Sequence, residues 1–224
     1  MLDWPAFGDA LWSVSDATGI RPEWQLPVLH LESGFDPSIV NSIGCSGLNQ
    51  FCPGTYGQYV PVPVDQYLAW PASRQLAGPI LAYWRNALKY GPVRSATRLM
   101  LAQLGPGLLA SAPTLESVVY AAPSQAYAGN SGFDPAGKGY FTVADVASAM
   151  AREGAAPAVR QALALAYASR PGERPRDPAY GDDWRPWVAP PAVRARLPLF
   201  AATFAVALAA AAGYAARERR RFAR

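Results

Sequence analysis

The sequence predicts a mainly α-helical protein that ends in a transmembrane helix. Through the first 168 residues, apolar residues recur at helical spacing in several short stretches. Of all 224 residues, 51% are hydrophobic and only 16% are charged, which fits a globular protein with an apolar segment attached. That segment is 197–216, where the chain runs through twenty residues without a charge. A chain of this length has room for one good-sized domain with accessory segments.

Two short helices are expected before residue 34. Apolar residues recur at helical spacing across 7–17, and Gly19 provides a stop. Pro22 suits the first turn of the second helix, because its missing N–H is not needed there. We expect this helix to bend at Pro27 and to end at residues 33–34.

The rest of the first 168 residues predicts further helices. Residues 55–70 mix aromatic residues with prolines, which exclude a long helix. Beyond them, periodic apolar residues and Thr114 as a helix cap predict helices over 74–90, 92–104, 114–121, 143–153 and 158–168.

The residue that points most directly to chemistry is Glu32, within the segment 26–56. It follows an apolar run, and apolar surroundings destabilise an ionised carboxylate. Glu32 would then keep its proton near neutral pH and deliver it to a leaving oxygen, as acid-assisted cleavage of a glycosidic bond requires. The alternative is an exposed residue in the last turn of a helix. His30 points to a different helix face and is expected to be structural.

The residues that follow Glu32 resemble the signature of the lysozyme-like lytic transglycosylases of the soluble lytic transglycosylase (SLT) type. That signature is Glu-Ser-x-Phe-x-Pro, then a Ser, Gly-Ala-x-Gly-Leu-Met-Gln and Pro-x-Thr. At the family's spacing, this chain has Glu32, Ser33, Phe35, Pro37, Ser42, Gly44, Gly47, Leu48, Gln50, Pro53 and Thr55. The resemblance implies a lysozyme-like domain over 1–168, with a small β/loop element at the active site.

The chain departs from the family at several positions. Cys45 stands where the family usually has Ala, and Asn49 where it has Met. The later Ala-Tyr-Asn-x-Gly-Pro-Gly motif survives only as LAQLGPG at 101–107, without its Tyr and Asn. The family also brings a late Tyr toward its Glu, and both Tyr120 and Tyr127 are candidates. The resemblance implies substrate contacts from Ser42, Ser46, Gln50, Gln103 and Tyr127.

The resemblance also implies the reaction, cleavage of the bond between MurNAc and GlcNAc in peptidoglycan. Glu32 first protonates the glycosidic oxygen and then, as a base, removes a proton from the muramyl 6-hydroxyl, which closes a 1,6-anhydro ring. This mechanism needs no cofactor, no metal and no second acid. Asp36, which precedes Pro37, is expected to belong to a turn. The alternative reaction is hydrolysis of the same bond, as in lysozyme.

Cys45 and Cys52 are the two cysteines of the chain. If their segment forms a hairpin-like loop, as the resemblance implies, they can approach closely enough for a disulfide. The alternative is a pair of small buried thiols. A disulfide would require an oxidising compartment such as a periplasm. Two cysteines and one histidine make a structural zinc site an unfavourable interpretation.

Residues 134–145 fit the frame of an EF-hand calcium loop. Asp134 occupies position 1, Gly139 position 6 and Asp145 position 12. Lys138, at position 5, places a cation in the ring of ligands. The sequence therefore predicts a degenerate loop in which Lys138 stands in for the metal charge.

The C-terminal part of the chain differs in composition from the rest. Residues 169–196 contain six prolines and predict an extended linker. The uncharged stretch 197–216 would span about 30 Å as a helix, which is roughly the thickness of a hydrocarbon core. Trp184 and Trp187 before it and the arginines after it favour a membrane span over an Ala-rich buried or partner helix.

The positive charge of the chain is concentrated at its end. The net charge of +4 depends largely on five arginines in the tail 217–224. The rest of the chain is close to neutral and has no basic footprint for nucleic acid. We expect the tail to contact anionic lipid.

The expected membrane topology indicates where in the cell envelope the protein acts. Positive-inside reasoning places the tail in a cytoplasm and the enzyme domain outside, where peptidoglycan lies. The first residues, MLDWP, lack the features of a signal peptide. We therefore interpret the chain as a phage virion protein, with other virion proteins as partners, that opens the cell wall so that the genome passes through. The alternatives are a tail-anchored bacterial enzyme, a lysis protein, or a non-catalytic glycan-binding structural protein of a virion or envelope.

Overall fold

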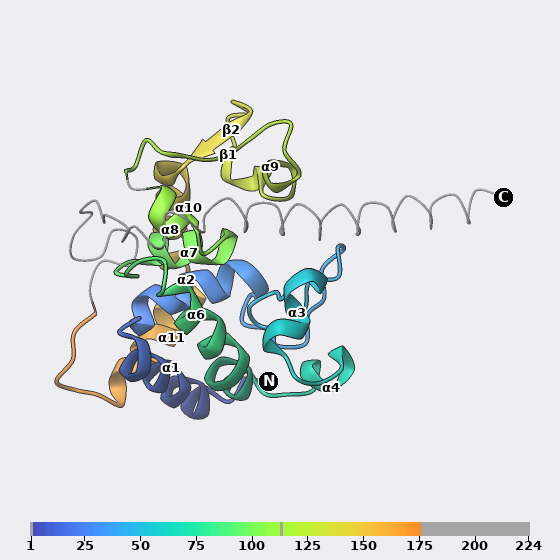
Figure 1. The fold of residues 1–224 in the computed structure, drawn as a ribbon. Coiled ribbons are helices and arrows are strands. Elements are labelled where there is room, and N and C mark those ends of the chain that lie inside the picture. The colour runs from blue at the N-terminus through green and yellow to red at the C-terminus, as the bar shows by residue number, and fades with distance from the viewer. Residues whose placement is uncertain (1, 113, 176–224) are drawn as a thin grey trace.

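Helix α2 (Pro22–Ser33) lies at the centre of the helical assembly in the computed structural model, which describes residues 2–112 and 114–175 (Figure 1). It packs against four helices that come from the beginning, the middle and the end of the described chain. They are α1 (Trp4–Thr18), α7 (Ala96–Leu104), α10 (Val143–Gly154) and α11 (Pro157–Ala168). The mainly α fold class is therefore confirmed.

Both N-terminal helices end at the predicted glycines, but α1 begins at Trp4, three residues before the predicted start. Asp3 caps α1 by accepting a hydrogen bond from the backbone N–H of Ala6, and Gly19 ends it in a left-handed conformation. Helix α2 begins with Pro22 and ends at Gly34, where φ is 61°. A glycine is favoured at this position because a side chain rarely adopts that conformation.

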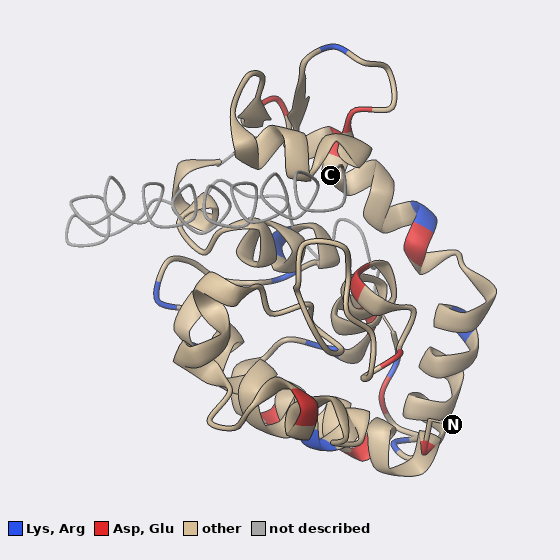
Figure 2. Ribbon diagram, turned by 90° about the vertical axis from the view of Figure 1, so that its right-hand side faces the viewer, with Lys and Arg blue, Asp and Glu red and all other residues tan. Residues whose placement is uncertain are grey.

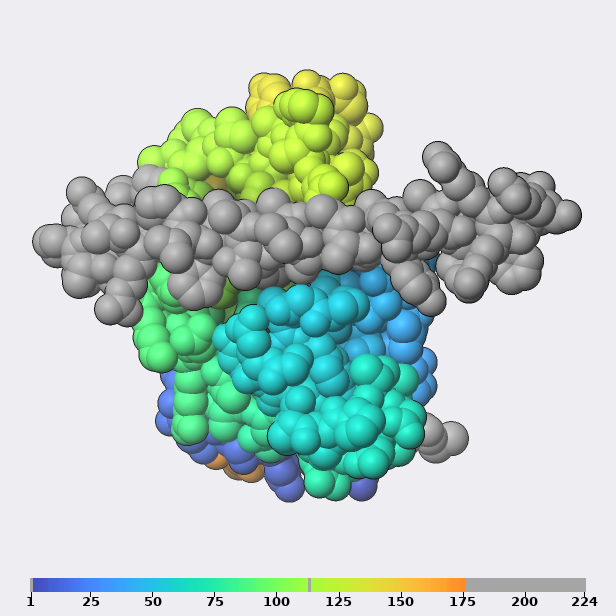
Figure 3. All heavy atoms as spheres, turned by 45° about the vertical axis from the view of Figure 1, so that its right-hand side comes forward, coloured from blue at the N-terminus to red at the C-terminus, as the bar shows by residue number. Residues whose placement is uncertain are grey.

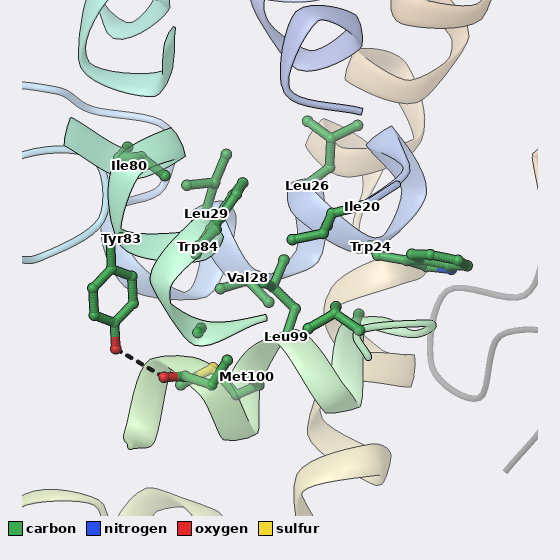
Figure 4. Packing of buried hydrophobic residues seen from close by; sticks show 14 of the residues in the cluster. Ile20, Trp24, Leu26, Val28, Leu29, Ile80, Tyr83, Trp84, Leu99 and Met100 are labelled. Atoms are coloured by element: carbon green, nitrogen blue, oxygen red, sulfur yellow. Dashed lines mark hydrogen bonds between the residues drawn. The ribbon is translucent and has the colours of Figure 1, made fainter. Parts of the chain in front are cut away.

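The core is formed by the apolar face of α2 and by residues that contact it from other helices. Figure 4 shows Val28 and Leu29 of α2 in one buried cluster with Trp84 and Leu99, and all four side chains are fully buried. Complete burial of one such side chain stabilises the fold by about 1.5–3 kcal/mol. This packing fixes the position of α2, whose last turn contains Glu32.

The helix predicted at 74–90 forms as three consecutive pieces. They are α5 (Ala72–Gln75), the π-helical turn η1 (Leu76–Ile80) and α6 (Leu81–Ala87). Pro79 lies inside this stretch and has no backbone N–H, so regular α-helical bonding is interrupted there. The helix predicted from residue 92 begins only at Ala96, because Ser95 caps it by accepting a bond from Arg98 N.

The predicted helix at 114–121 was wrong. Residues Val118–Ala121 form strand β1, which pairs antiparallel with β2 (Tyr140–Thr142). Val118 and Val119 are β-branched and favour strands. Their pairing partner lies some twenty residues further on, so local periodicity contained no sign of it.

Short helices complete the described chain. They are α3 (Pro53–Tyr59), α4 (Val64–Leu68), α8 (Leu108–Ser111), α9 (Gln125–Gly129) and the 3₁₀ turn η2 (Ser131–Phe133). Helices α3 and α4 confirm that 55–70 contains no long helix. The space-filling view shows that the segment around α3 and α4 and the segment around β1 and β2 lie on the same face (Figure 3).

Charged residues are few and scattered over the described helices (Figure 2). Most of the predicted linker 169–196, the predicted membrane helix 197–216 and the basic tail 217–224 lie outside the described residues. Within 2–112 and 114–175, none of the helices has the length and apolar character needed to cross a membrane.

Candidate active site

Glu32 occupies the last turn of α2, two residues before the left-handed Gly34. Its side chain is half-buried, and no described residue forms a hydrogen bond with its carboxyl group. Burial raises the pKa of Glu32 from 4.5 to about 8, because the surrounding protein destabilises the charged form. Glu32 is therefore mainly protonated at neutral pH, with an O–H group that is free to donate.

Tyr83 of α6 lies close enough to Glu32 for the two groups to interact electrostatically. Its hydroxyl donates to the main-chain carbonyl of Ala102 at 2.8 Å, the bond drawn in Figure 4, and lies 3.3 Å from that of Gln103. Burial raises the pKa of Tyr83, so the hydroxyl stays protonated. Tyr83 thus connects α6 to the C-terminal end of α7 beside the acid. The sequence indicated only a core residue here, because its spacing along α6 is that of packing.

The loop after α2 forms a small irregular β element. Ser46 makes isolated bridges with Val40 and Phe51, and a disulfide joins Cys45 to Cys52. At Gly47, φ is 77°, and a Cβ atom there would lie 2.3 Å from the Tyr67 ring. Only glycine fits so close to the ring.

Gln75 fixes this loop to the helical part of the domain. It is fully buried, its Oε1 accepts from Leu48 N at 2.8 Å, and its Nε2 donates to the carbonyls of Pro37 and Tyr67 at 2.9 and 3.0 Å. These bonds span both ends of the loop. The sequence contained no signal for this role of Gln75.

The residues expected to contact the substrate differ in their burial and in their hydrogen-bond partners. Gln103 reaches the loop, where its Nε2 donates to the carbonyl of Asn49 at 2.8 Å. Gln50 is nearly buried and donates to the carbonyl of Gly47 at 2.9 Å. Ser42 lies exposed on the loop. Ser46 is fully buried with its hydroxyl 3.5 Å from the carbonyl of Phe51, so in this conformation it supports the loop and has no surface for a substrate.

The two candidate tyrosines occupy different places. Tyr120 donates to the carbonyl of Leu104 at 2.7 Å, at the same end of α7 that Tyr83 contacts, and burial raises the pKa of Tyr120 to about 12. Tyr127 instead donates to Asp134 at 2.9 Å. Tyr120 therefore contacts the end of α7 that Tyr83 also contacts, whereas Tyr127 does not.

Asn49 and Gln103 contribute polar atoms without partners. Asn49 is fully buried, and neither its Nδ2 nor its Oδ1 has a hydrogen-bond partner among the described residues. The same holds for the Oε1 of Gln103. An unsatisfied buried amide costs about 1–3 kcal/mol, so these groups are exceptions to the rule that buried polar atoms are paired.

Two other ionisable groups near Glu32 in sequence have structural roles. The Asp36 carboxylate accepts from the N–H and hydroxyl of Ser38 at 2.8 and 2.6 Å, and these bonds lower the pKa of Asp36. This is the turn that the sequence predicts. His30 contacts Glu153 of α10 at 2.8 Å and so connects α2 to α10.

The EF-hand-like loop contains an internal ion pair. Lys138 Nζ lies 2.8 and 3.0 Å from the two carboxylate oxygens of Asp145, at the last position of the loop. Asp134 accepts from the backbone N–H of Gly139 at 2.8 Å. Among the described residues, no group of three or more His, Cys, Asp or Glu side chains is arranged to hold a metal ion.

Compared with known proteins, the chain matches no protein-family model, no curated protein and no solved structure. The resemblance to lytic transglycosylases therefore rests on the motif residues of the chain and on their spacing.

Proposed function

We propose that this chain is a lysozyme-like lytic transglycosylase that cleaves the glycan strands of peptidoglycan, with Glu32 as its single acid and base. The observation that carries the proposal is the state of Glu32, a half-buried carboxyl with a pKa of about 8. A general acid must hold a proton at the working pH and have it free to donate. Glu32 meets both requirements, and it also occupies the acid position of the family motif.

In the proposed reaction, Glu32 donates its proton to the oxygen that joins MurNAc to GlcNAc, and the bond from that oxygen to C1 of MurNAc breaks. The Glu32 carboxylate then takes the proton of the muramyl 6-hydroxyl, and the oxygen of that hydroxyl bonds to C1 of MurNAc. The product is a 1,6-anhydro ring, and Glu32 is protonated again. This reaction needs only one carboxyl group. The nearby carboxylate of Asp36 is not needed as a second one, and it accepts hydrogen bonds from Ser38 in a turn.

The residues around the acid have supporting roles in this proposal. Tyr83 and Tyr120 hold the end of α7 beside Glu32. Gln103 joins the end of α7 to the loop through its bond to the carbonyl of Asn49. Gln50 and Gln75 shape the loop on which Asn49 lies.

The proposal includes a cellular setting. Residues 197–216 anchor the enzyme in a membrane, the basic tail lies on the cytoplasmic side, and the domain 1–168 faces the peptidoglycan. In a phage particle, such an enzyme would open the wall so that the genome passes through. The support for this setting is the composition of the C-terminal segments.

A zymogram on purified murein tests the enzymatic proposal. The full chain in detergent should clear murein, Glu32→Gln should not, and the matched variant Glu116→Gln, at an exposed glutamate, should clear it as the wild type does. Clearing by Glu32→Gln at the wild-type rate, or none by the wild type, would refute the proposal.

The products separate the possible reactions. Mass spectrometry should find 1,6-anhydro-muramyl ends, whereas reducing ends alone would indicate a lysozyme-type hydrolase. The second candidate is a non-catalytic glycan-binding protein of a virion or envelope, and it is favoured by Ala102 and Gln103 at the positions of the family's Tyr and Asn. Sedimentation of the wild type with murein that stays uncleaved would support that candidate.

A further inference from the structure

The Cys45–Cys52 disulfide brackets the segment that supports the site around Glu32. The two cysteines are 7 residues apart, and the described residues contain no free cysteine. Cys45 is buried, whereas Cys52 is partly exposed. A thiol reductant therefore has access to Cys52 in the folded domain.

The bracketed segment 46–51 has a backbone that depends on its surroundings. Gly47 and Gln50 both have positive φ values, 77° and 48°. For a residue with a side chain such as Gln50, this conformation is uncommon and persists only where neighbouring structure enforces it. Apart from the two isolated bridges at Ser46, the segment belongs to no strand or helix. The disulfide closes its two ends covalently.

A continuous series of contacts connects this segment to the acid. The Asn49 carbonyl accepts a bond from Gln103 at 2.8 Å, and Gln103 lies in the last turn of α7. The hydroxyl of Tyr83 donates to Ala102 in the same turn at 2.8 Å, and Tyr83 interacts electrostatically with Glu32. These contacts link Asn49 to Tyr83, which lies beside Glu32.

We propose that the Cys45–Cys52 disulfide is a redox switch, which keeps the site around Glu32 in its working geometry when oxidised and releases it when reduced. The inference rests on the proposed function. A reducing cytoplasm would keep the newly made enzyme inactive, and an oxidising compartment that contains peptidoglycan would activate it. The producing cell would thus be protected from its own enzyme.

The chemistry of the switch is thiol–disulfide exchange. A thiolate of a dithiol reductant attacks Sγ of Cys52, and Cys45 leaves and takes up a proton. The second thiol of the reductant then displaces Cys52, which leaves as a thiol. Two electrons and two protons pass to the chain, and the reductant becomes a cyclic disulfide.

Murein clearing by the full chain in detergent, before and after treatment with dithiothreitol, tests the switch. Reduction should lower the rate by about tenfold to hundredfold, which is the effect of a small misplacement of reacting groups, and reoxidation should restore it. Cys45→Ala/Cys52→Ala should stay at the low rate with or without dithiothreitol. Equal rates before and after reduction, with two free thiols found by titration, would overturn the proposal.

Circular dichroism and amide hydrogen exchange distinguish a redox switch from a purely structural disulfide. Circular dichroism should show that reduction leaves the helix content unchanged, and unfolding instead would show that the disulfide is a structural staple and no switch. Amide hydrogen exchange should accelerate on reduction both in 46–51 and at 101–105. If the oxidised chain clears no murein, the proposed function fails. If hydrogen exchange at 101–105 is unchanged by reduction, the proposed coupling between the segment 46–51 and Glu32 is rejected.

Discussion

Replacing Glu32 with glutamine should change how the stability of the protein depends on pH. Burial holds the pKa of Glu32 at about 8 in the folded chain, against 4.5 for an ordinary glutamate. Below pH 4.5 both the folded and the unfolded chain carry the proton. As the pH rises from 4.5 to 8, the unfolded chain releases this proton while the folded chain retains it, so the wild type loses stability. Above pH 8 the loss levels off, and Glu32→Gln, which has no proton to release, avoids it.

The magnitude follows from the two pKa values. Their separation corresponds to about 5 kcal/mol, at about 1.36 kcal/mol for each pKa unit. Glu32 is only half-buried, so water screens part of the effect and we expect about half of it, roughly 2–3 kcal/mol. In a domain of this size, such a difference raises the melting temperature by about 5–10 °C.

Thermal unfolding between pH 4 and pH 9 measures this effect without any substrate. Glu32→Gln should match the wild type near pH 4 and exceed it increasingly up to pH 8. Glu116→Gln is the matched control, because Glu116 is exposed, and it should follow the wild type at every pH. If the difference between Glu32→Gln and the wild type stays constant over the whole range, the reasoning about the buried acid is refuted.

Three substitutions test the structure around the acid, each by its melting temperature. Gly47→Ala places a Cβ atom 2.3 Å from the Tyr67 ring and should cost about 3 kcal/mol or more, whereas the control Gly57→Ala meets nothing within 4 Å and should be harmless. Gln75→Leu leaves several buried groups unpaired and should cost about 2–4 kcal/mol; a loss under 1 kcal/mol would contradict its anchoring role. Tyr83→Phe removes one buried hydrogen bond of 2.8 Å and should cost about 1 kcal/mol, and an unchanged melting temperature would argue against that bond.

Much of the helical fold could be predicted from local sequence patterns. The ends of α2 at Pro22 and Gly34 follow from the conformations that these two residues favour, which involve only neighbouring residues. The prediction failed at Val118–Ala121, where the choice of a strand depends on pairing with Tyr140–Thr142. A partner so distant in the chain leaves no trace in local periodicity.

The candidate site was also only partly predictable from the sequence. The sequence predicted Glu32 as the acid because an apolar run and a spaced motif surround it. It contained no sign that Tyr83, some fifty residues away, lies beside Glu32. It also left Tyr120 and Tyr127 as candidates for one role, and the structure bonds Tyr120 to Leu104 of α7 and Tyr127 to Asp134.

The sequence by itself determined the helical class, the pair of cysteines and the cation at Lys138, and it singled out Glu32 as the candidate acid, because each depends on residue type and short-range spacing. Only the tertiary structure decided what surrounds the acid. The pKa of Glu32 is raised by burial, and burial is produced by helices and loops that meet from distant parts of the chain. Desolvation depends on all the atoms packed around a group, so it exists only once the chain has folded.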